Sequence, residues 1–239
     1  MEKVVIIINA DVSEQGKLIA ASPVTQKMVE ALQRSIAENS SSTEVEIVSA
    51  ATLWSKNSNS KVIKKNRDSE TIYCPLTIQV PEYFDFAQKQ IYSACKDVNA
   101  RRRWVETNLG FKTSVGDSWL GHLWLPIILS DELVYAEIIG EGSMPNSYEQ
   151  PVAIPSRQLK SLHSLAEKLL ENLDAPPATY LLQFSLYNGE IVFDRLWPFP
   201  AAPALITLKT QQPDLFTCHW QCLTKQPIKD ISISDPMPI

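Results

Sequence analysis

The chain has 239 residues, of which 44% are hydrophobic and 21% are charged, and it carries a formal net charge of −5 at pH 7. This composition is typical of a folded soluble protein, and the acidic balance argues against nucleic-acid binding, which requires a basic surface. No apolar run reaches the roughly 18–20 residues that cross a bilayer, and four cysteines do not make a disulfide framework in a chain of this length, so we expect a cytoplasmic protein.

The first 54 residues predict a small N-terminal α/β unit. Residues 3–10 contain a continuous apolar run, Val4–Ile8, typical of a strand that is covered on both faces. Ser22 and Pro23 supply an N-cap and a favoured first helical residue for an amphipathic helix that extends to residue 39. A second strand is expected at 43–50, and this strand–helix–strand order predicts a parallel pair.

A polar segment separates this unit from the rest of the chain. Residues 55–70 show no periodic apolar pattern and predict a loop or linker. This makes residues 71–228 a second region, with both helices and strands. Its first strand is expected at 71–80, where Pro75 indicates a sheet edge or a bulge because proline cannot donate to a ladder.

A long helix is expected to begin at Pro81 and to end at Gly110, since glycine favours the left-handed conformation that follows a helix. Within it, Arg101–Arg103 form a basic cluster that we expect to be a solvated face. The glycines between Gly110 and Gly121 indicate a mobile loop, which is a candidate for the rim of a pocket.

Two further strands are expected at 123–130 and 132–140, joined by a short turn at Ser130-Asp131. Ser156 is expected to cap an amphipathic helix, because leucines recur on one face of the segment that follows it. Residues 229–239 are expected to be a loosely held tail.

The sharpest local signal is Asn188-Gly189, which supplies the positive φ angles of a two-residue type I′ turn. The flanking segments, 178–187 and 190–197, are rich in β-branched and aromatic residues, so they predict a β-hairpin. A proline-rich exit follows the hairpin, and residues 214–228 predict a closing helix.

Residues 124–228 resemble the second half of an ATP-grasp domain, and most of all that of carboxyaminoimidazole ribonucleotide synthetase. The shared order is a strand pair, a helix, a hairpin that ends in an acidic residue, a Pro-x-Pro exit and a final helix. Phe216, His219, Pro227 and Ile228 keep the spacing of that family's final helix. The resemblance implies an α/β fold: the small N-terminal unit followed by an ATP-grasp-like mixed or antiparallel sheet with packed helices.

The chain departs from that family where its hairpin binds metal and phosphate. The family's hairpin supplies Glu and Asn, whereas here Asp194 is followed by Arg195, and Gln183 lies on the partner strand. Phe199 replaces the arginine of the family's exit. None of the seven glycines forms a phosphate-binding motif. We therefore expect a degenerate scaffold without a cofactor, acting as a non-catalytic protein-binding, assembly or regulatory factor.

The alternative is an ATP- and magnesium-dependent ligase of the carboxylate–amine type. In that case the resemblance implies Asp194 as a metal ligand, Arg195 as a phosphate contact and Glu137 as the second carboxylate. No catalytic residue is assigned in either case.

A protein partner would need an exposed surface, and aromatic residues near the hairpin exit are the candidates. Trp197, Phe199 and Trp220 would form this partner interface if they are partly exposed, while the alternative is that Trp197 and Phe199 pack beneath the final helix. Cys218 and Cys222 share a helix face and are expected to be core residues, so no metal site is predicted there.

Overall fold

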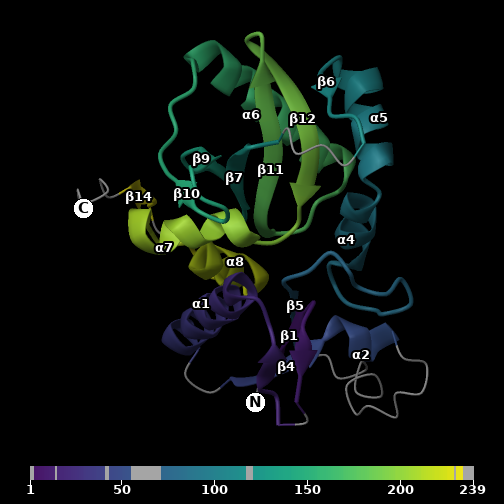
Figure 1. Ribbon diagram of the computed structural model, residues 1–239, viewed down its shortest axis with the longest axis vertical. Coiled ribbons are helices and arrows are strands. Elements are labelled where there is room, and N and C mark those ends of the chain that lie inside the picture. Colours follow the sequence, from purple (N-terminus) through teal and green to yellow (C-terminus); the bar gives the residue numbers. More distant parts are fainter. Residues whose placement is uncertain are drawn as a thin grey trace. The chain divides into compact units, whose positions relative to one another are not determined.

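The computed structural model describes residues 3–13, 15–40, 43–54, 71–116, 121–228 and 230–233. The chain forms two compact units, Met1–Ser93 and Ala94–Ile239 (Figure 1). The predicted linker at 55–70 lies outside the described residues. Among those that are described, no helix is long and apolar enough to cross a membrane.

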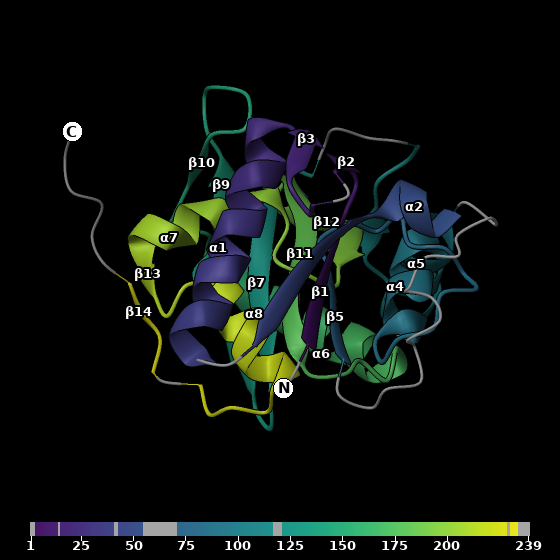
Figure 2. The ribbon, with the colours of Figure 1, turned by 90° about the horizontal axis from the view of Figure 1, so that it is seen from below.

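The first unit contains a three-stranded parallel sheet in the order β4–β1–β5, with β1 and β5 side by side in Figure 2. Its strands are β1 (Lys3–Ile8), β4 (Glu44–Ser49) and β5 (Thr71–Pro75). The central strand β1 is buried from Val4 to Ile8, as its continuous apolar run predicts. The parallel pairing of β1 with β4 and the edge position of β5 are both confirmed. Because β5 pairs with β1, this unit extends beyond segment 55–70.

The helix that follows β1 begins as the sequence predicts. Helix α1 (Pro23–Asn39) starts after Ser22, whose side chain accepts a hydrogen bond from the backbone nitrogen of Thr25 at 3.1 Å. The smaller elements of this region are β2 (Asp11–Val12), β3 (Leu18–Ala20) and α2 (Ala50–Trp54).

The expected long helix from Pro81 to Gly110 is instead two shorter helices, α4 (Lys89–Lys96) and α5 (Val98–Leu109). Asp97 separates them, because its carboxylate accepts a hydrogen bond from the backbone nitrogen of Ala100 and so caps a new helix. Pro81 lies in a loop before α4. Gly110 ends α5 with a φ of 71°, as predicted.

The second unit contains a seven-stranded mixed sheet in the order β10–β9–β7–β11–β12–β6, and β8 also pairs with β7. Among the described strands of this sheet, β6 and β12 pair in parallel and the other pairs are antiparallel. The strands are β6 (Lys112–Thr113), β7 (Leu123–Leu129), β8 (Leu133–Tyr135), β9 (Ile139–Glu141), β10 (Tyr148–Glu149), β11 (Ala178–Tyr187) and β12 (Glu190–Trp197). This agrees with the predicted fold class.

The single strand expected at 132–140 is divided into β8 and β9. Pro126 of β7 lies opposite the break, and its backbone oxygen accepts from the nitrogen of Ala136 at 3.1 Å. In an antiparallel pair a residue's oxygen and nitrogen face the same neighbour, and the proline nitrogen has no hydrogen to donate. The ladder is therefore incomplete at this point.

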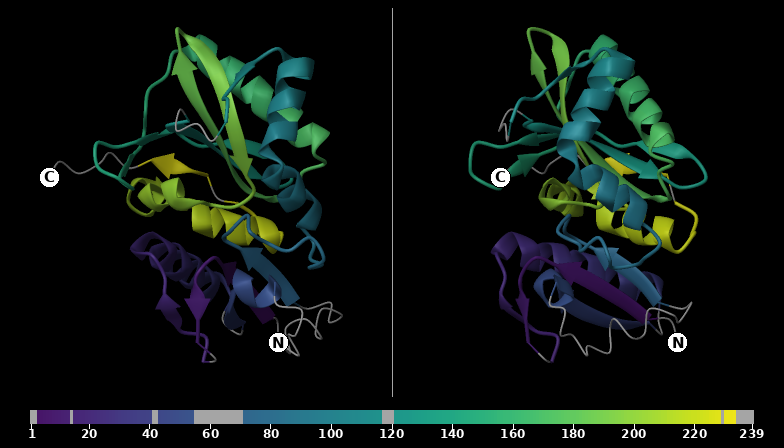
Figure 3. Two further views of the ribbon diagram at one scale, coloured as in Figure 1. Left: turned by 45° about the vertical axis from the view of Figure 1, so that its right-hand side comes forward. Right: turned by 90° about the vertical axis from the view of Figure 1, so that its right-hand side faces the viewer.

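The predicted hairpin of β11 and β12 is confirmed and forms the long ribbon seen in Figure 3. Asn188 and Gly189 have φ angles of 52° and 75°, as a type I′ turn requires. A bulge between Gln183 and Phe184 shifts the register where the hairpin approaches its exit.

Helices α6 (Ser156–Asn172) and α8 (Leu215–Leu223) complete this unit. Ser156 was expected to be the N-cap of α6, but it is the first helical residue and Pro155 occupies the cap position. Asp214 caps α8. The remaining elements are η1 (Ala202–Ile206), α7 (Thr207–Thr210), β13 (Gln211–Gln212) and β14 (Ser232–Ile233). Within the expected tail, β14 pairs with β13.

Candidate functional site

The end of β12 carries a buried acidic side chain that is paired with an arginine from α5. Asp194 is 0% exposed and Arg102 is 5% exposed. The Nη2 group of Arg102 donates to Oδ1 of Asp194, and its Nε group donates to the backbone oxygen of Asp194 at 3.0 Å. Its Nη1 group donates to the backbone oxygen of Gly116 at 2.5 Å. A buried charge is stable only when it is paired and hydrogen-bonded, so each of these side chains requires the other.

The expectation that Arg101–Arg103 form a solvated face is wrong at Arg102. This residue lies four positions after Val98 and three before the buried Val105, so it occupies the apolar face of α5. In the sequence, the helical spacing of Arg102 with Val98 and Val105 was the feature that could have indicated its burial. Its partner, 92 residues further along, could not be deduced from that pattern.

The main chain at Gly121 lies directly against the same carboxylate. A Cβ atom at this position would be 2.6 Å from Oδ2 of Asp194 and 2.8 Å from Cγ of Gln183, so only glycine fits here without displacing them. Oδ2 is buried and accepts no hydrogen bond from the described residues. Such an atom is costly to leave unpaired, which marks this end of β12 as a candidate site.

Arg195 lies beside this pair, with its guanidinium near the ring of Trp197. Gln183 faces Arg195 across the hairpin, and its Nε2 group donates to the backbone oxygen of Gly121 at 2.5 Å. Its Oε1 atom accepts from Nε1 of Trp197 at 3.0 Å. The Arg195 guanidinium lies 5.7 Å from the centre of the Trp197 ring, and its Nε atom is 3.4 Å from Oδ1 of Asp194. The Arg195 side chain is 24% exposed, so part of it reaches solvent.

The structure does not bring Glu137 to this cluster. Glu137 is exposed and lies between β8 and β9, with β7 and β11 between it and β12. Three strand spacings correspond to roughly 14 Å. Its backbone oxygen accepts from Nε2 of Gln150 at 2.9 Å. The expectation that Glu137 is a second carboxylate beside Asp194 is therefore wrong.

Two of the three aromatic residues near the hairpin exit lack the exposure that the expected partner interface requires. Phe199 is 3% exposed and Trp220 is 0% exposed, so both pack inside the protein. Trp197 is half-buried and contacts Phe199 edge-on, with ring centres 6.0 Å apart. Phe199 is thus buried, as the alternative expects, and Trp220 lies on the final helix itself.

The residues at this site do not fit a magnesium ion held by the protein. Magnesium requires about six oxygen ligands in octahedral geometry, and protein sites usually supply one or two carboxylates. Here Oδ1 of Asp194 is engaged by two arginines, and Gly121 covers Oδ2. Nowhere in the described parts of the chain do three or more acidic, histidine or cysteine side chains gather as a metal site would require.

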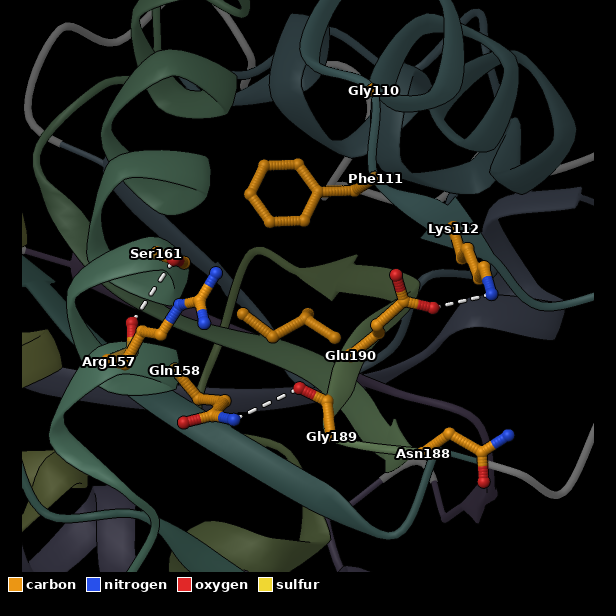
Figure 4. A pocket seen from close by; sticks show the side chains of 10 residues that line it. Gly110, Phe111, Lys112, Arg157, Gln158, Ser161, Asn188, Gly189 and Glu190 are labelled. Atoms are coloured by element: carbon orange, nitrogen blue, oxygen red, sulfur yellow. Dashed lines mark hydrogen bonds and ion pairs between the residues drawn. The ribbon is translucent and has the colours of Figure 1, made fainter.

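A separate cavity of about 420 Å³ lies at the other end of β12, beside the hairpin turn (Figure 4). The predicted rim loop contributes Gly110 to its lining. The ring of Phe111 and the guanidinium of Arg157 face into this space in Figure 4. Lys112 and Glu190 form an ion pair of 2.5 Å at its edge, but both side chains are more than half exposed, so the pair contributes little stability.

Comparison with known proteins defines the class of this fold. No family model matches the chain. A structure described as glycinamide-RNase-transformylase T from Mycobacterium tuberculosis aligns with a TM-score of 0.67 and 13% identity, over 95% of this chain and 82% of the other. N5-carboxyaminoimidazole ribonucleotide synthetase from Thermotoga maritima gives a TM-score of 0.65 and 11% identity, over 96% and 77%. The chain has the ATP-grasp fold, as the sequence resemblance predicts.

Within that class, the sequence is similar to formate-dependent phosphoribosylglycinamide formyltransferases. The protein of this name from Prochlorococcus marinus strain MIT 9303 is 30% identical over 105 residues, which are 43% of this chain and 26% of that protein. The one from Haloquadratum walsbyi is 24% identical over 110 residues, 45% of this chain and 27% of that protein. The match thus spans about a quarter of the length of these relatives.

These comparisons overturn the expectation of a non-catalytic protein-binding, assembly or regulatory factor. The similar proteins are named as a formyltransferase, a transformylase and a synthetase, all of them enzymes. They favour the ATP-dependent ligase that the sequence analysis gave as its alternative.

Proposed function

We propose that this protein is an ATP-dependent carboxylate–amine ligase that acts on a small carboxylate, with formate as the first candidate. The observation that carries the proposal is the pair of arginines, Arg102 from α5 and Arg195 from β12, that meets Asp194. This pair lies within a fold shared with a carboxyaminoimidazole ribonucleotide synthetase. Formate is a candidate because the relatives that are similar in sequence are formate-dependent enzymes by name. We place the activity in the cytoplasm, where the four free cysteines would stay reduced.

The chemistry requires that the carboxylate first gain a leaving group. Transfer of the terminal phosphoryl group of ATP to a carboxylate oxygen supplies one, and the amine then displaces phosphate and loses a proton. Phosphoryl transfer needs mainly positioning and positive charge from the protein. Arg195 is the partly exposed cation at the end of β12, so in this proposal it contacts the transferred phosphate.

The experiment measures ADP release by the purified protein with ATP, formate and a panel of amines that includes phosphoribosylglycinamide. We expect ADP and phosphate to form in a formate- and amine-dependent manner, and the formylated amine to be detected by mass spectrometry. Arg195→Gln should lower the rate at least tenfold, whereas Lys209→Gln, which removes an exposed positive charge on α7, should not change it. If no carboxylate in a broader panel stimulates ADP release, the proposed function is wrong.

A further inference from the structure

The charges at the end of β12 do not cancel. Asp194 contributes one negative charge, while Arg102 and Arg195 contribute two positive charges. Arg102 uses all three of its guanidinium nitrogens on Asp194 and Gly116, and it is buried. Among the described residues, the Asp194 charge is thus balanced by Arg102, and the charge of Arg195 remains as a surplus of one.

The free end of Arg195 is available to a ligand. Its Nε atom makes only a long contact of 3.4 Å with Asp194, and its two terminal nitrogens have no acceptor within the described parts of the chain. The guanidinium carbon lies 5.7 Å from the centre of the Trp197 ring, and Trp197 is in turn fixed by its hydrogen bond to Gln183. A planar fork held in this way is suited to two parallel hydrogen bonds with a phosphate or carboxylate.

A metal cation, unlike a phosphate, would be bound poorly at the end of β12. The surplus positive charge repels it, and the carboxylate offers only an oxygen that is covered by Gly121. Gln183, which faces Arg195 across the hairpin, has its amide oxygen occupied by Trp197. Oδ1 of Asp194 and the amide oxygen of Gln183, which could bind magnesium, are thus each engaged by another side chain.

We propose that the end of β12 binds the phosphate chain of a nucleotide directly through Arg195, with no metal ion between protein and phosphate. The proposal rests on the proposed function, because it assigns a binding mode to the nucleotide of that reaction. Asp194 is then a positioning residue that orients Arg102 and Arg195. This role differs from the metal ligand that the sequence resemblance implies.

Isothermal titration calorimetry with ATP, inorganic tripolyphosphate and adenosine tests the proposal, in EDTA and in excess magnesium. We expect ATP and tripolyphosphate to bind in EDTA, adenosine to bind at least tenfold more weakly, and magnesium to leave ATP affinity unchanged or lower. Arg195→Gln should weaken ATP binding at least tenfold, and Lys209→Gln should weaken it less than twofold. Circular dichroism and the thermal midpoint check that both variants are folded.

Asp194→Asn separates the two roles of this carboxylate. As a positioning residue, its neutral form should leave ATP affinity in EDTA within about threefold of the original or raise it, because a negative charge is removed beside the phosphate. If Asp194→Asn does not fold, the Arg195→Gln comparison still decides the question. Adenosine binding as tightly as ATP would show that the base is recognised instead, and would overturn the proposal.

Other outcomes distinguish this inference from the proposed function. Binding that requires magnesium, or no binding in either condition, overturns the inference, and ADP release then judges the enzyme activity separately. An equal loss of ATP affinity in Arg195→Gln and Lys209→Gln would point to general charge attraction, and it would also overturn the inference. Metal-independent binding without any carboxylate-dependent ADP release supports the inference and contradicts the proposed function.

Discussion

His219 replaces a missing strand partner at the start of the hairpin. Its Nδ1 atom accepts a hydrogen bond from the backbone nitrogen of Thr179 at 3.1 Å, at a point where β12 has ended. Only an imidazole without a proton on Nδ1 can accept this bond. Burial lowers the pKa of His219 from 6.5 to about 3, because the charged form loses its hydration.

This predicts a pH dependence of stability that belongs to His219. Between pH 6.5 and about 3 the unfolded chain binds a proton at this residue and the folded chain does not. Its contribution is therefore complete above pH 6.5 and is lost as the pH falls through this window, by up to about 1.4 kcal/mol per pH unit. In His219→Asn, whose amide oxygen takes the place of Nδ1, urea denaturation should show a shallower loss of unfolding free energy across this range.

A substitution that changes no titratable group, such as Gly189→Ala, is the control, and its pH dependence should follow that of the unchanged protein. If His219→Asn has the same pH dependence as the original chain, the assignment of a neutral buried imidazole is wrong.

At the residue scale, the sequence predicted the position of Asp194 at the end of the hairpin but not its surroundings. The turn signal places Asp194 from local residues alone. Its engagement by Arg102 and its contact with Gly121 depend on how α5 and the segment before β7 meet the hairpin. Because of those contacts, Oδ1 of Asp194 is engaged by arginines and Oδ2 is covered by Gly121. The motif alone therefore could not show whether Asp194 can bind magnesium.

At the scale of single elements, the hairpin turn depends on the backbone freedom of Gly189. Its φ angle is 75°, and an added Cβ would meet nothing nearer than Nε2 of Gln158 at 3.8 Å, an ordinary contact. We predict that Gly189→Ala lowers the unfolding free energy by about 1–2 kcal/mol, the cost of the left-handed conformation for a residue with a Cβ. Chemical denaturation measures this change.

Gly189→Asn serves as the comparison, because asparagine adopts this conformation more readily than alanine. The unfolding free energy of Gly189→Asn should fall by less than that of Gly189→Ala. Equal losses in the two variants would indicate that the turn is limited by side-chain contacts and not by the backbone angle.

Elements that depend on local signals were predicted well, and those that depend on a partner were not. The strand β1 and the turn at Asn188-Gly189 follow from runs and residue types that act locally. Asp97 interrupts a continuous amphipathic pattern by capping a new helix, and periodicity alone does not reveal this. The division between β8 and β9 depends on Pro126 in a different strand, so it is visible only after the pairing is known.

At the scale of the whole molecule, three of the four buried cysteines report separately on the two units. Cys74 lies in the first unit, and Cys218 and Cys222 lie in the second. Burial raises the pKa of each thiol, to about 12 for Cys222, so the reactive thiolate is scarce in the folded protein. We expect negligible reaction with a thiol reagent until the surrounding unit unfolds.

Because each unit has its own core, we predict two different urea midpoints. Cys74 should become labelled at one urea concentration, and Cys218 together with Cys222 at another, as measured by peptide mass spectrometry after brief labelling. A single common midpoint for all three would show that the units unfold as one. Fast labelling without urea would contradict the buried positions.

The pairing of Arg102 with Asp194 also has a consequence in time. These residues are 92 positions apart, whereas β11 and β12 are joined by a two-residue turn. Contacts that are distant in sequence close slowly, so we expect the hairpin to form early and α5 to join it late. During synthesis, Arg102 leaves the ribosome long before its partner exists. Until then Arg102 lacks the negative charge that allows its burial. We therefore expect α5 to pack against the sheet only after the hairpin is complete.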